Sequence, residues 1–244
     1  MIDTHAHLDS LEDADAAVAR ANDAGVTRIV TVGTHPESWA RALAIAERHV
    51  GVHAALGYHP HDAVAADLGA LRDALAHPKV VAVGEAGLDF FREGHAPADV
   101  QQRVFAAQLE LAVELGKPIV VHTRAADAET LAALEGFAGT VVLHCFTSQA
   151  FLEPALANGW YVSFAGNVTY KNAHDLRAAA FAIPAERLLA ETDSPYLAPV
   201  PLRGRTNEPA NVVHTVAVLA HARNEDAAEL AAQIDANATR CFQL

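Results

Sequence analysis

The sequence predicts an α/β protein built as one (β/α)8 TIM barrel over residues 1–244. Three observations support this fold. Short apolar, β-branched runs alternate with Ala-rich segments of helical period. Eight such pairs fit into 244 residues, which matches the size and rhythm of a TIM barrel. No linker-like Gly/Ser run, low-complexity tract or internal repeat marks a boundary, so a single domain is expected.

The apolar runs are the expected strands. They lack polar alternation, as parallel strands do when helices cover one side and side chains fill the other. The expected strands are residues 2–4, 28–32, 52–56, 80–83, 118–121, 140–143, 160–164 and 188–191. The expected helices lie near residues 13–24, 36–49, 63–76, 98–115, 127–135, 148–158, 173–181 and 207–222.

Glycine and asparagine mark several expected helix ends. Gly25, Gly116 and Gly159 each stand just before a strand, where a helix needs a left-handed C-terminal cap. Asn207 is expected to cap the last helix, with Pro209 in the first turn, where its missing N–H is not required.

An open doubly wound sheet is the alternative fold. Such a sheet rarely needs eight strands, and it usually opens on a Gly-rich phosphate-binding loop. The stretch Gly-Glu-Ala-Gly at 84–87 lacks the G-x-G-x-x-G spacing of that loop. The barrel is therefore favoured.

Composition narrows the class of protein. Hydrophobic residues make up 52% of the chain and charged residues 19%, which permits a large core and argues against disorder. No apolar run reaches the roughly 18–20 residues of a membrane span. Cys145 and Cys241 do not form a disulfide framework. We therefore expect a cytoplasmic, monomeric protein with no membrane partner.

The net charge is −13, from 17 basic and 30 acidic residues. A protein that coats nucleic acid usually has a basic face, so long-range attraction to DNA or RNA should be weak here. Any action on a nucleic acid is expected to be salt-sensitive and distributive. The 14 histidines are the clearest compositional hint of function.

Most of the expected strands end, on their carboxyl side, in a histidine or a carboxylate. The residues at these ends are His5 and His7, His59, Glu85, His122, His144 and Asp193. Barrel enzymes build their sites at this end of the strands. His5 and His7 alternate along the first strand, so both imidazoles face the same side.

These side chains together indicate a metal centre. Taken singly, each could be a hydrogen-bonded structural residue. When they are gathered over an apolar barrel, their burial costs much free energy unless a cation is bound among them. Four of these histidines together with the two acids already exceed the number of ligands that one ion needs. Two ions about 3.5–4 Å apart would use all six side chains. Imidazoles favour zinc and carboxylates favour magnesium or manganese, so two divalent ions (Mg, Mn or Zn) are expected.

Six short motifs lie at intervals along the chain: DTHAHLD (3–9), GEAGLD (84–89), VHTR (121–124), HCF (144–146), ETDSP (191–195) and NEP (207–209). In combination they resemble the motifs of the TatD-related metal-dependent hydrolases, or TatD-type DNases. The resemblance implies a TIM barrel of the metallo-dependent hydrolase type and a hydrolase of ester bonds. It also implies a DNase with a role in DNA repair or degradation, commonly a 3′-to-5′ exonuclease on single-stranded DNA.

The resemblance also implies roles for single residues. His5, His7, Glu85 and Asp193 would bind one ion, and Glu85, His122 and His144 the second, so that Glu85 bridges. The two ions would activate a water for attack on the phosphodiester. Asp193 and Glu85 are the expected catalytic residues, with Asp193 as a general base that mainly orients the water.

Substrate contacts are expected from the loops that follow the strands. The expected contacts are His59, Arg124, Lys171, Arg203 and Arg205. Arginine can bind a phosphate with two hydrogen bonds, although a solvated surface charge is the common alternative. Tyr58, Phe90, Phe91 and Tyr170 offer aromatic faces for an unstacked base. The family often has consecutive basic residues before its Asn-Glu-Pro motif, but here Thr206 takes one of those positions.

Two other functions stay open. The same site could hydrolyse an ester or amide, including a D-aminoacyl ester on tRNA, so RNA or tRNA is an alternative partner. The second alternative is a barrel that binds ligands without catalysis, but none of the six metal-binding side chains is missing.

Cys145 and seven of the histidines are not expected to take part in catalysis. Cys145 should be buried and face away from the site, because its neighbour His144 faces inward. The histidines expected to be non-catalytic are His35, His49, His53, His77, His174, His214 and His221.

Overall fold

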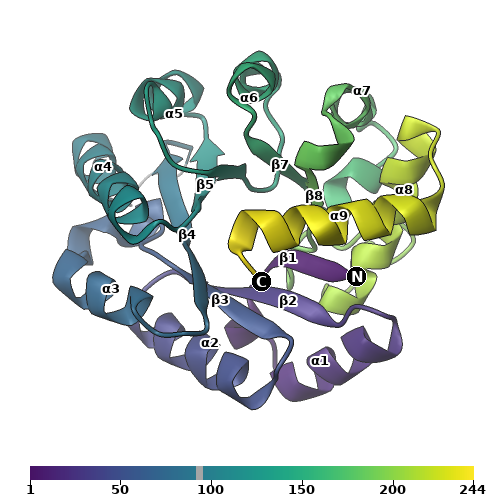
Figure 1. The fold of residues 1–244 in the computed structure, drawn as a ribbon, viewed down its shortest axis with the longest axis horizontal. Coiled ribbons are helices and arrows are strands. Elements are labelled where there is room, and N and C mark those ends of the chain that lie inside the picture. Colours follow the sequence, from purple (N-terminus) through teal and green to yellow (C-terminus); the bar gives the residue numbers. More distant parts are fainter. Residues whose placement is uncertain (92–95) are drawn as a thin grey trace.

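The computed structural model describes residues 1–91 and 96–244, and it confirms the predicted barrel. Eight parallel strands follow one another around the sheet in sequence order (Figure 1). The strands are β1 (Ile2–Ala6), β2 (Arg28–Gly33), β3 (Val52–Leu56), β4 (Val80–Asp89), β5 (Ile119–Arg124), β6 (Val141–Leu143), β7 (Tyr161–Phe164) and β8 (Leu188–Ala190).

The helices lie outside the strands, and all but the last form a ring around them (Figure 1). They are α1 (Ala14–Asp23), α2 (Pro36–Arg48), α3 (Leu68–Leu75), α4 (Ala98–Leu115), α5 (Asp127–Leu134), α6 (Leu152–Asn158), α7 (His174–Ala182), α8 (Val212–Arg223) and α9 (Ala227–Phe242). The strands are buried almost throughout, which explains their continuous apolar runs. In the described residues, we find no helix that is long and apolar enough to cross a membrane.

The barrel closes between its first and last strands. Ala6 and Ser194 form a parallel bridge, and the N–H of His7 donates to the carbonyl of Ser194 at 2.7 Å. Deeper in the barrel, the buried carboxylate of Asp3 accepts from the backbone N–H of Thr192 at 2.9 Å and from its hydroxyl at 2.5 Å. Two segments that are far apart in the sequence are thereby fixed side by side at the mouth of the barrel, the end at which the strands have their carboxyl ends.

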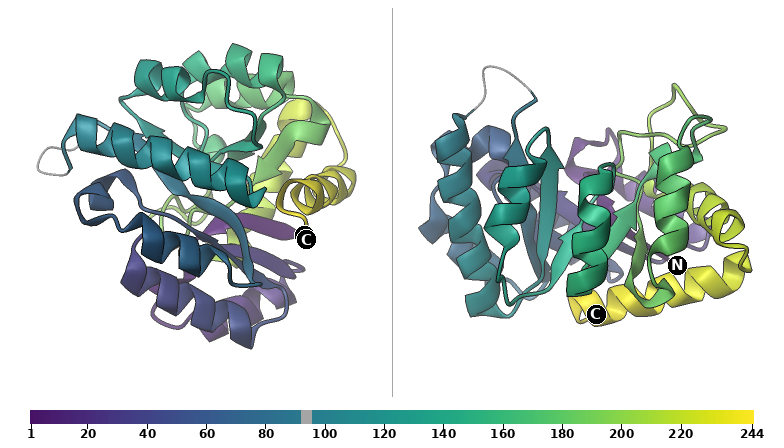
Figure 2. Two further views of the ribbon diagram at one scale, coloured as in Figure 1. Left: turned by 60° about the vertical axis from the view of Figure 1, so that its left-hand side comes forward. Right: turned by 90° about the horizontal axis from the view of Figure 1, so that it is seen from above.

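Helix α9 was absent from the sequence prediction. It crosses the barrel at the end where the chain begins, opposite the mouth (Figures 1 and 2). Leu230 and Ile234 are buried on its inner face, and Asn237 donates to the carbonyl of Leu188 at 2.7 Å. Asp226 caps its first turn. The prediction stopped too early because eight strand–helix pairs were already complete.

Other local predictions had mixed outcomes. Gly116 and Gly159 end α4 and α6 with φ of 62° and 64°, and the predicted left-handed caps are confirmed. The continuous helix predicted over 63–76 was wrong in its first part. A 3-10 helix covers Pro60–Ala65, and Asp67 then caps α3 through the N–H of Ala70.

The predicted cap at Asn207 was also wrong. Helix α8 begins at Val212, after a 3-10 turn over Pro209–Asn211. Asn207 is fully buried instead, and its amide donates to the carbonyls of Thr192 at 2.9 Å and Tyr196 at 2.7 Å. Its side chain therefore stabilises the loop after β8.

Candidate metal centre

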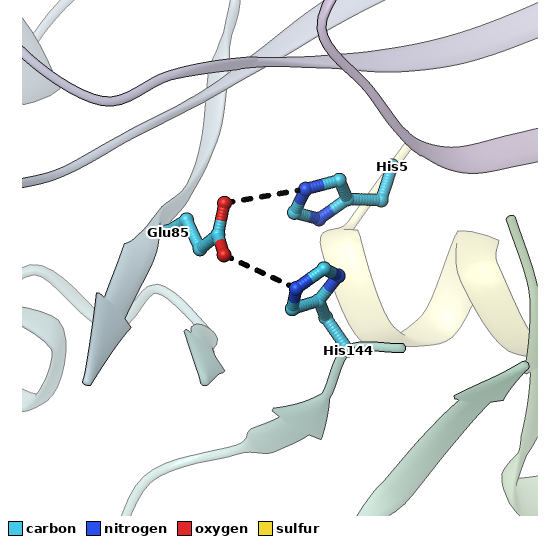
Figure 3. Close-up of side chains that lie close together, drawn as sticks. All are labelled: His5, Glu85 and His144. Carbon is cyan, nitrogen blue, oxygen red and sulfur yellow. Dashed lines mark ion pairs between the residues drawn. The ribbon is translucent and has the colours of Figure 1, made fainter. Parts of the chain in front are cut away.

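The six predicted metal-binding side chains meet at the carboxyl end of the barrel. The structure places His5 in β1, His7 just after it, Glu85 in β4, His122 in β5, His144 directly after β6, and Asp193 after β8. Figure 3 shows the carboxylate of Glu85 facing the neighbouring imidazoles of His5 and His144, with one oxygen directed toward each ring. Glu85 and His5 are buried, with 3% and 1% of their surface exposed.

Close backbone packing brings β4 and β5 together at this point. Gly87 has φ of 150°, and a Cβ there would collide with the carbonyl of His122. A glycine is therefore required, and its absent side chain lets His122 lie beside Glu85. The N–H of Asp193 donates to the carbonyl of His5 at 2.9 Å, which places Asp193 next to the β1 histidines.

The first donor group consists of His5, His7, Asp193 and the Oε2 atom of Glu85. The two Nε2 atoms of His5 and His7 are 3.4 Å apart. They lie 3.5 and 3.7 Å from Glu85 Oε2. They lie 3.9 and 3.5 Å from Asp193 Oδ1.

These separations fit a metal ion. Ligand atoms about 2.1 Å from a tetrahedral ion lie about 3.4 Å from each other. The five separations run from 3.4 to 3.9 Å, all longer than the roughly 2.7–3.2 Å of an N–H···O hydrogen bond. Two imidazoles and two carboxylates spaced in this way are a donor set for a divalent cation.

The second donor group surrounds the other oxygen of Glu85. Glu85 Oε1 lies 2.6 Å from His122 Nδ1, 3.1 Å from His144 Nε2 and 3.7 Å from His59 Nε2. The two shorter contacts are direct hydrogen bonds, so the imidazoles of His122 and His144 are drawn onto Glu85. An ion among them would require these separations to lengthen toward about 3.4 Å.

Further carboxylates hold the second group in place. His144 Nδ1 lies 3.0 Å from Glu191 Oε1, which also accepts from the N–H of Cys145 at 2.8 Å. A carboxylate behind a metal-binding imidazole fixes the orientation of its ring. Asp89 lies behind the other imidazole, 3.6 Å from His122 Nε2, and is bonded to His61 at 2.8 Å. Sequence reasoning assigned no role to Glu191, Asp89 or His61, although two of them stand within the quoted motifs.

The charges at the site support one another. Burial opposes ionisation of Glu85, but His144 and His122 hold its pKa well below the usual value. Burial lowers the pKa of His144, but Glu85 and Glu191 raise it well above the usual value. The pKa of His122 is also raised, by Asp89 and Glu85 against the effect of burial. Burial instead lowers the pKa of His5. The carboxylate of Glu85 and the imidazoles of His122 and His144 therefore stabilise each other's charged forms, whereas burial favours the neutral form of His5.

Five of the six predicted metal-binding side chains, all but His5, line a cavity of about 820 Å³. Its described lining includes the carboxylates of Asp9, Asp62, Glu85, Asp89 and Asp193, and the guanidinium groups of Arg41 and Arg124. Arg41 lies 3.5 Å from Asp9, so part of its charge is already balanced. Divalent cations held at the centre would add positive charge beside these carboxylates and would attract an anionic substrate.

The predicted substrate contacts fall into two groups. His59 and Arg124 line the cavity, whereas Lys171, Arg203 and Arg205 are not among its lining residues. The guanidinium of Arg203 lies 3.8 Å from the ring centre of Tyr170, and that of Arg124 lies 3.9 Å from the ring centre of Phe91. Their contact with a substrate stays a prediction.

One expectation about a neighbouring residue was wrong. Cys145 lines the cavity instead of facing away. Strand β6 ends at Leu143 and Cys145 has φ of 45°, so side chains no longer alternate there. His35, which is expected to be non-catalytic, also lines the cavity, from the residue before α2. Tyr196 lines it too, and sequence reasoning did not single it out.

Comparison with known proteins identifies the class to which this barrel and centre belong. The family model "TatD related DNase" matches residues 2–243. The uncharacterized metal-dependent hydrolase TatD of Mycobacterium tuberculosis is 41% identical, over 100% of this chain and 98% of its own length. The 3′-5′ ssDNA/RNA exonuclease TatD of Escherichia coli K12 is 39% identical, over 95% of this chain and 93% of its own length.

Solved structures agree with this result. The crystal structure of YjjV, a TatD homologue from Escherichia coli, superposes with a TM-score of 0.93 at 33% identity, over 100% of this chain and 98% of that one. The chain therefore belongs to the TatD related DNase family and is a metal-dependent hydrolase.

Proposed function

We propose that this protein is a divalent-metal-dependent nuclease that removes nucleotides from the 3′ end of single-stranded DNA, with two cations that share Glu85. The observation that carries the proposal is the division of the Glu85 carboxylate between two groups of histidines. Oε2 faces His5 and His7, and Oε1 faces His122 and His144. A carboxylate shared in this way is the arrangement that bridges two metal ions about 3.5–4 Å apart.

The family relationship supports the substrate class. Relatives about 40% identical over nearly the whole chain are named 3′-5′ ssDNA/RNA exonucleases, so RNA is the second polynucleotide to test. The carboxylates of the cavity fit a metal-dependent nuclease, because they can hold divalent cations, which would in turn attract an anionic phosphodiester.

Bound cations would supply a nucleophile at neutral pH and would neutralise charge on the phosphoryl oxygens. The protein's own residues hold and orient the other participants. Interaction with His7 and His144 keeps the pKa of Asp193 below its usual value despite burial, so its carboxylate is ionised at neutral pH. Asp193 lines the cavity and can accept a hydrogen bond from the attacking water.

Two cavity residues can contact the phosphate. His59 Nδ1 accepts from the N–H of His61 at 3.1 Å, so in the neutral ring the proton is on Nε2, the atom directed toward Glu85. Burial lowers the pKa of His59 to about 3, so the ring is neutral and donates through Nε2. Arg124 has no ion pair within residues 1–91 and 96–244, and its guanidinium can bind a phosphate through two hydrogen bonds.

The test is a matrix of metals against substrates. Metal-free protein is supplied with Mg²⁺, Mn²⁺ or Zn²⁺ and assayed on 5′-labelled single-stranded DNA, RNA and D-aminoacyl-tRNA. The expected result is stepwise loss of mononucleotides from the 3′ end of DNA. Release of D-amino acids without nucleotides would favour the deacylase, and no turnover with any metal would favour a non-catalytic barrel. Glu85→Ala serves as the inactive control.

A further inference from the structure

Tyr196 is a large aromatic side chain left exposed at the metal centre. It is 57% exposed and lines the cavity. Its ring centre lies 6.0 Å from that of His7, with the planes at 70°. None of the hydrogen bonds among the described residues involves its hydroxyl group. An exposed ring next to a metal-binding imidazole has apolar surface available for a ligand in the same cavity.

The backbone beneath this ring is held firmly. The N–H of Tyr196 donates to the carbonyl of Asp193 at 2.8 Å, and its carbonyl accepts from the buried Asn207 at 2.7 Å. Asn207 also bonds the carbonyl of Thr192. One side chain therefore fixes both the segment that carries Asp193 and the segment that presents the Tyr196 ring. A ligand that contacts the ring loses little binding free energy to ordering of the loop.

The same loop is tied to the loop after β7. The N–H of Val200 donates to the hydroxyl of Thr169 at 2.9 Å, and the hydroxyl of Tyr170 donates to the carbonyl of Ala198 at 3.3 Å. These bonds support the loop at residues that follow Tyr196 in the sequence. Tyr196 is thus a rigid aromatic surface beside the metal centre.

Other aromatic side chains near the mouth are less well placed. Tyr58 is 1% exposed, so it has no face for a ligand. Phe91 is 61% exposed, but Arg124 lies over one face of its ring, and Arg203 lies over the ring of Tyr170. Neither Phe91 nor Tyr170 is among the described lining residues of the cavity. Among these four aromatic rings, Tyr196 is the one that lines the cavity beside the predicted metal-binding side chains.

We propose that Tyr196 is the stacking surface for the base of the terminal nucleotide, the one whose phosphodiester lies at the metal centre. This inference rests on the proposed nuclease function. Aromatic–base stacking accepts every base, because each has a π-face, so it suits an enzyme that degrades any sequence. Bases inside a duplex are already stacked on their neighbours. The contact therefore favours single-stranded ends.

The experiment compares two labelled single-stranded DNA substrates that differ only at the 3′-terminal nucleotide. One carries thymine there, and the other carries a tetrahydrofuran residue with no base. The quantity measured is the ratio of kcat/KM for the two substrates. In the unsubstituted protein we expect this ratio to be roughly 5 to 150, the range that one stacked base provides. Tyr196→Ala should bring it close to 1, mainly through KM.

Two controls isolate the ring. Tyr196→Phe keeps the aromatic face and should retain the preference for a base. Phe181→Ala removes a ring that is 65% exposed on α7 and is not among the lining residues, and it should leave the ratio unchanged. A Tyr196→Ala variant with a disturbed metal centre would lose activity on both substrates, and the ratio cancels that loss.

The outcomes separate this inference from the proposed function. If the unsubstituted protein degrades both substrates and Tyr196→Ala has the same ratio, base stacking on Tyr196 is wrong while the nuclease function stands. Equal loss of the ratio in Tyr196→Phe and Tyr196→Ala would assign the effect to the hydroxyl and would also overturn the inference. If no single-stranded DNA is degraded with any metal, both proposals fail.

Discussion

Replacement of Glu85 should disable both metal positions at once. Its carboxylate lies within 3.7 Å of the four imidazoles predicted to bind metal, at 3.5 and 3.7 Å through Oε2 and at 2.6 and 3.1 Å through Oε1. In Glu85→Gln the shape is kept, but the negative charge that both proposed ions share is lost. In Glu85→Ala the donor atoms are lost as well.

The expected size of the effect follows from ligand losses at metal sites. Mutation of a residue behind a metal ligand already weakens affinity by about 10–100-fold. Loss of the shared ligand should therefore lower the binding affinity of each ion by at least about 100-fold, which is about 2.8 kcal/mol of binding free energy per ion. If hydrolysis needs both ions, turnover at limiting metal should fall by about 10⁴-fold, the product of the two losses.

The assay is calorimetric metal titration of metal-free protein, followed by turnover at each metal concentration. Glu110→Gln, which changes an exposed glutamate on α4, is the matched control and should titrate normally. Circular dichroism checks that each variant is folded. If the titration shows weaker binding of one ion and unchanged binding of the other, Glu85 is not a ligand shared by both ions. Near-normal turnover of Glu85→Ala with added metal would lead to the same conclusion.

Three further predictions concern the order of metal binding, the orientation of one imidazole and the grip on phosphate. Metal should bind in two steps. The second ion, beside His122 and His144, should bind more tightly as the pH rises. The raised pKa values of His122 and His144 keep protons on these rings below those pKa values, and the ion must displace them; a second step equally tight across pH 6–8, followed by calorimetry, would contradict this. Glu191→Gln should weaken that second ion about 10–100-fold and spare the first, because Glu191 orients His144; equal weakening of both ions in the titration would refute it. Arg124→Ala should raise KM with kcat little changed, and should reduce the slope of log(kcat/KM) against log[salt] by about 0.7, the share of one phosphate on a single strand. Arg103→Ala, an exposed arginine on α4 paired with Asp99, is its control, and an unchanged slope for Arg124→Ala would count against phosphate contact.

Much of the fold could be predicted because its signals are local. Apolar runs and helical periods are written in consecutive residues, and the eight pairs imply a closed sheet of parallel strands. Helix α9 also has a local signal, with Asp226 as its cap and Leu230 and Ile234 on one face. Its position beneath the barrel has none, because that depends on the apolar surface that β8 and β1 leave to be covered.

The candidate metal-binding set could be predicted for the same reason. In a parallel barrel every strand ends at the same rim, so a polar residue at a strand end is placed in space by its position in the sequence. This rule failed at Cys145, where a residue with positive φ follows the end of β6 and the alternation of side chains stops. It also gave no information about Tyr196, which lies in a loop.

The sequence by itself determined the strand order and the side chains that reach the rim, because both follow from the periodicity of neighbouring residues. Only the tertiary structure decided how those side chains share their partners. The two oxygens of Glu85 face different histidines, Glu191 lies behind His144, and Asn207 holds the loop that presents Tyr196. These contacts join residues 11 to 80 positions apart in the sequence, and they form only when the folded barrel brings the strand ends and the loops that follow them together.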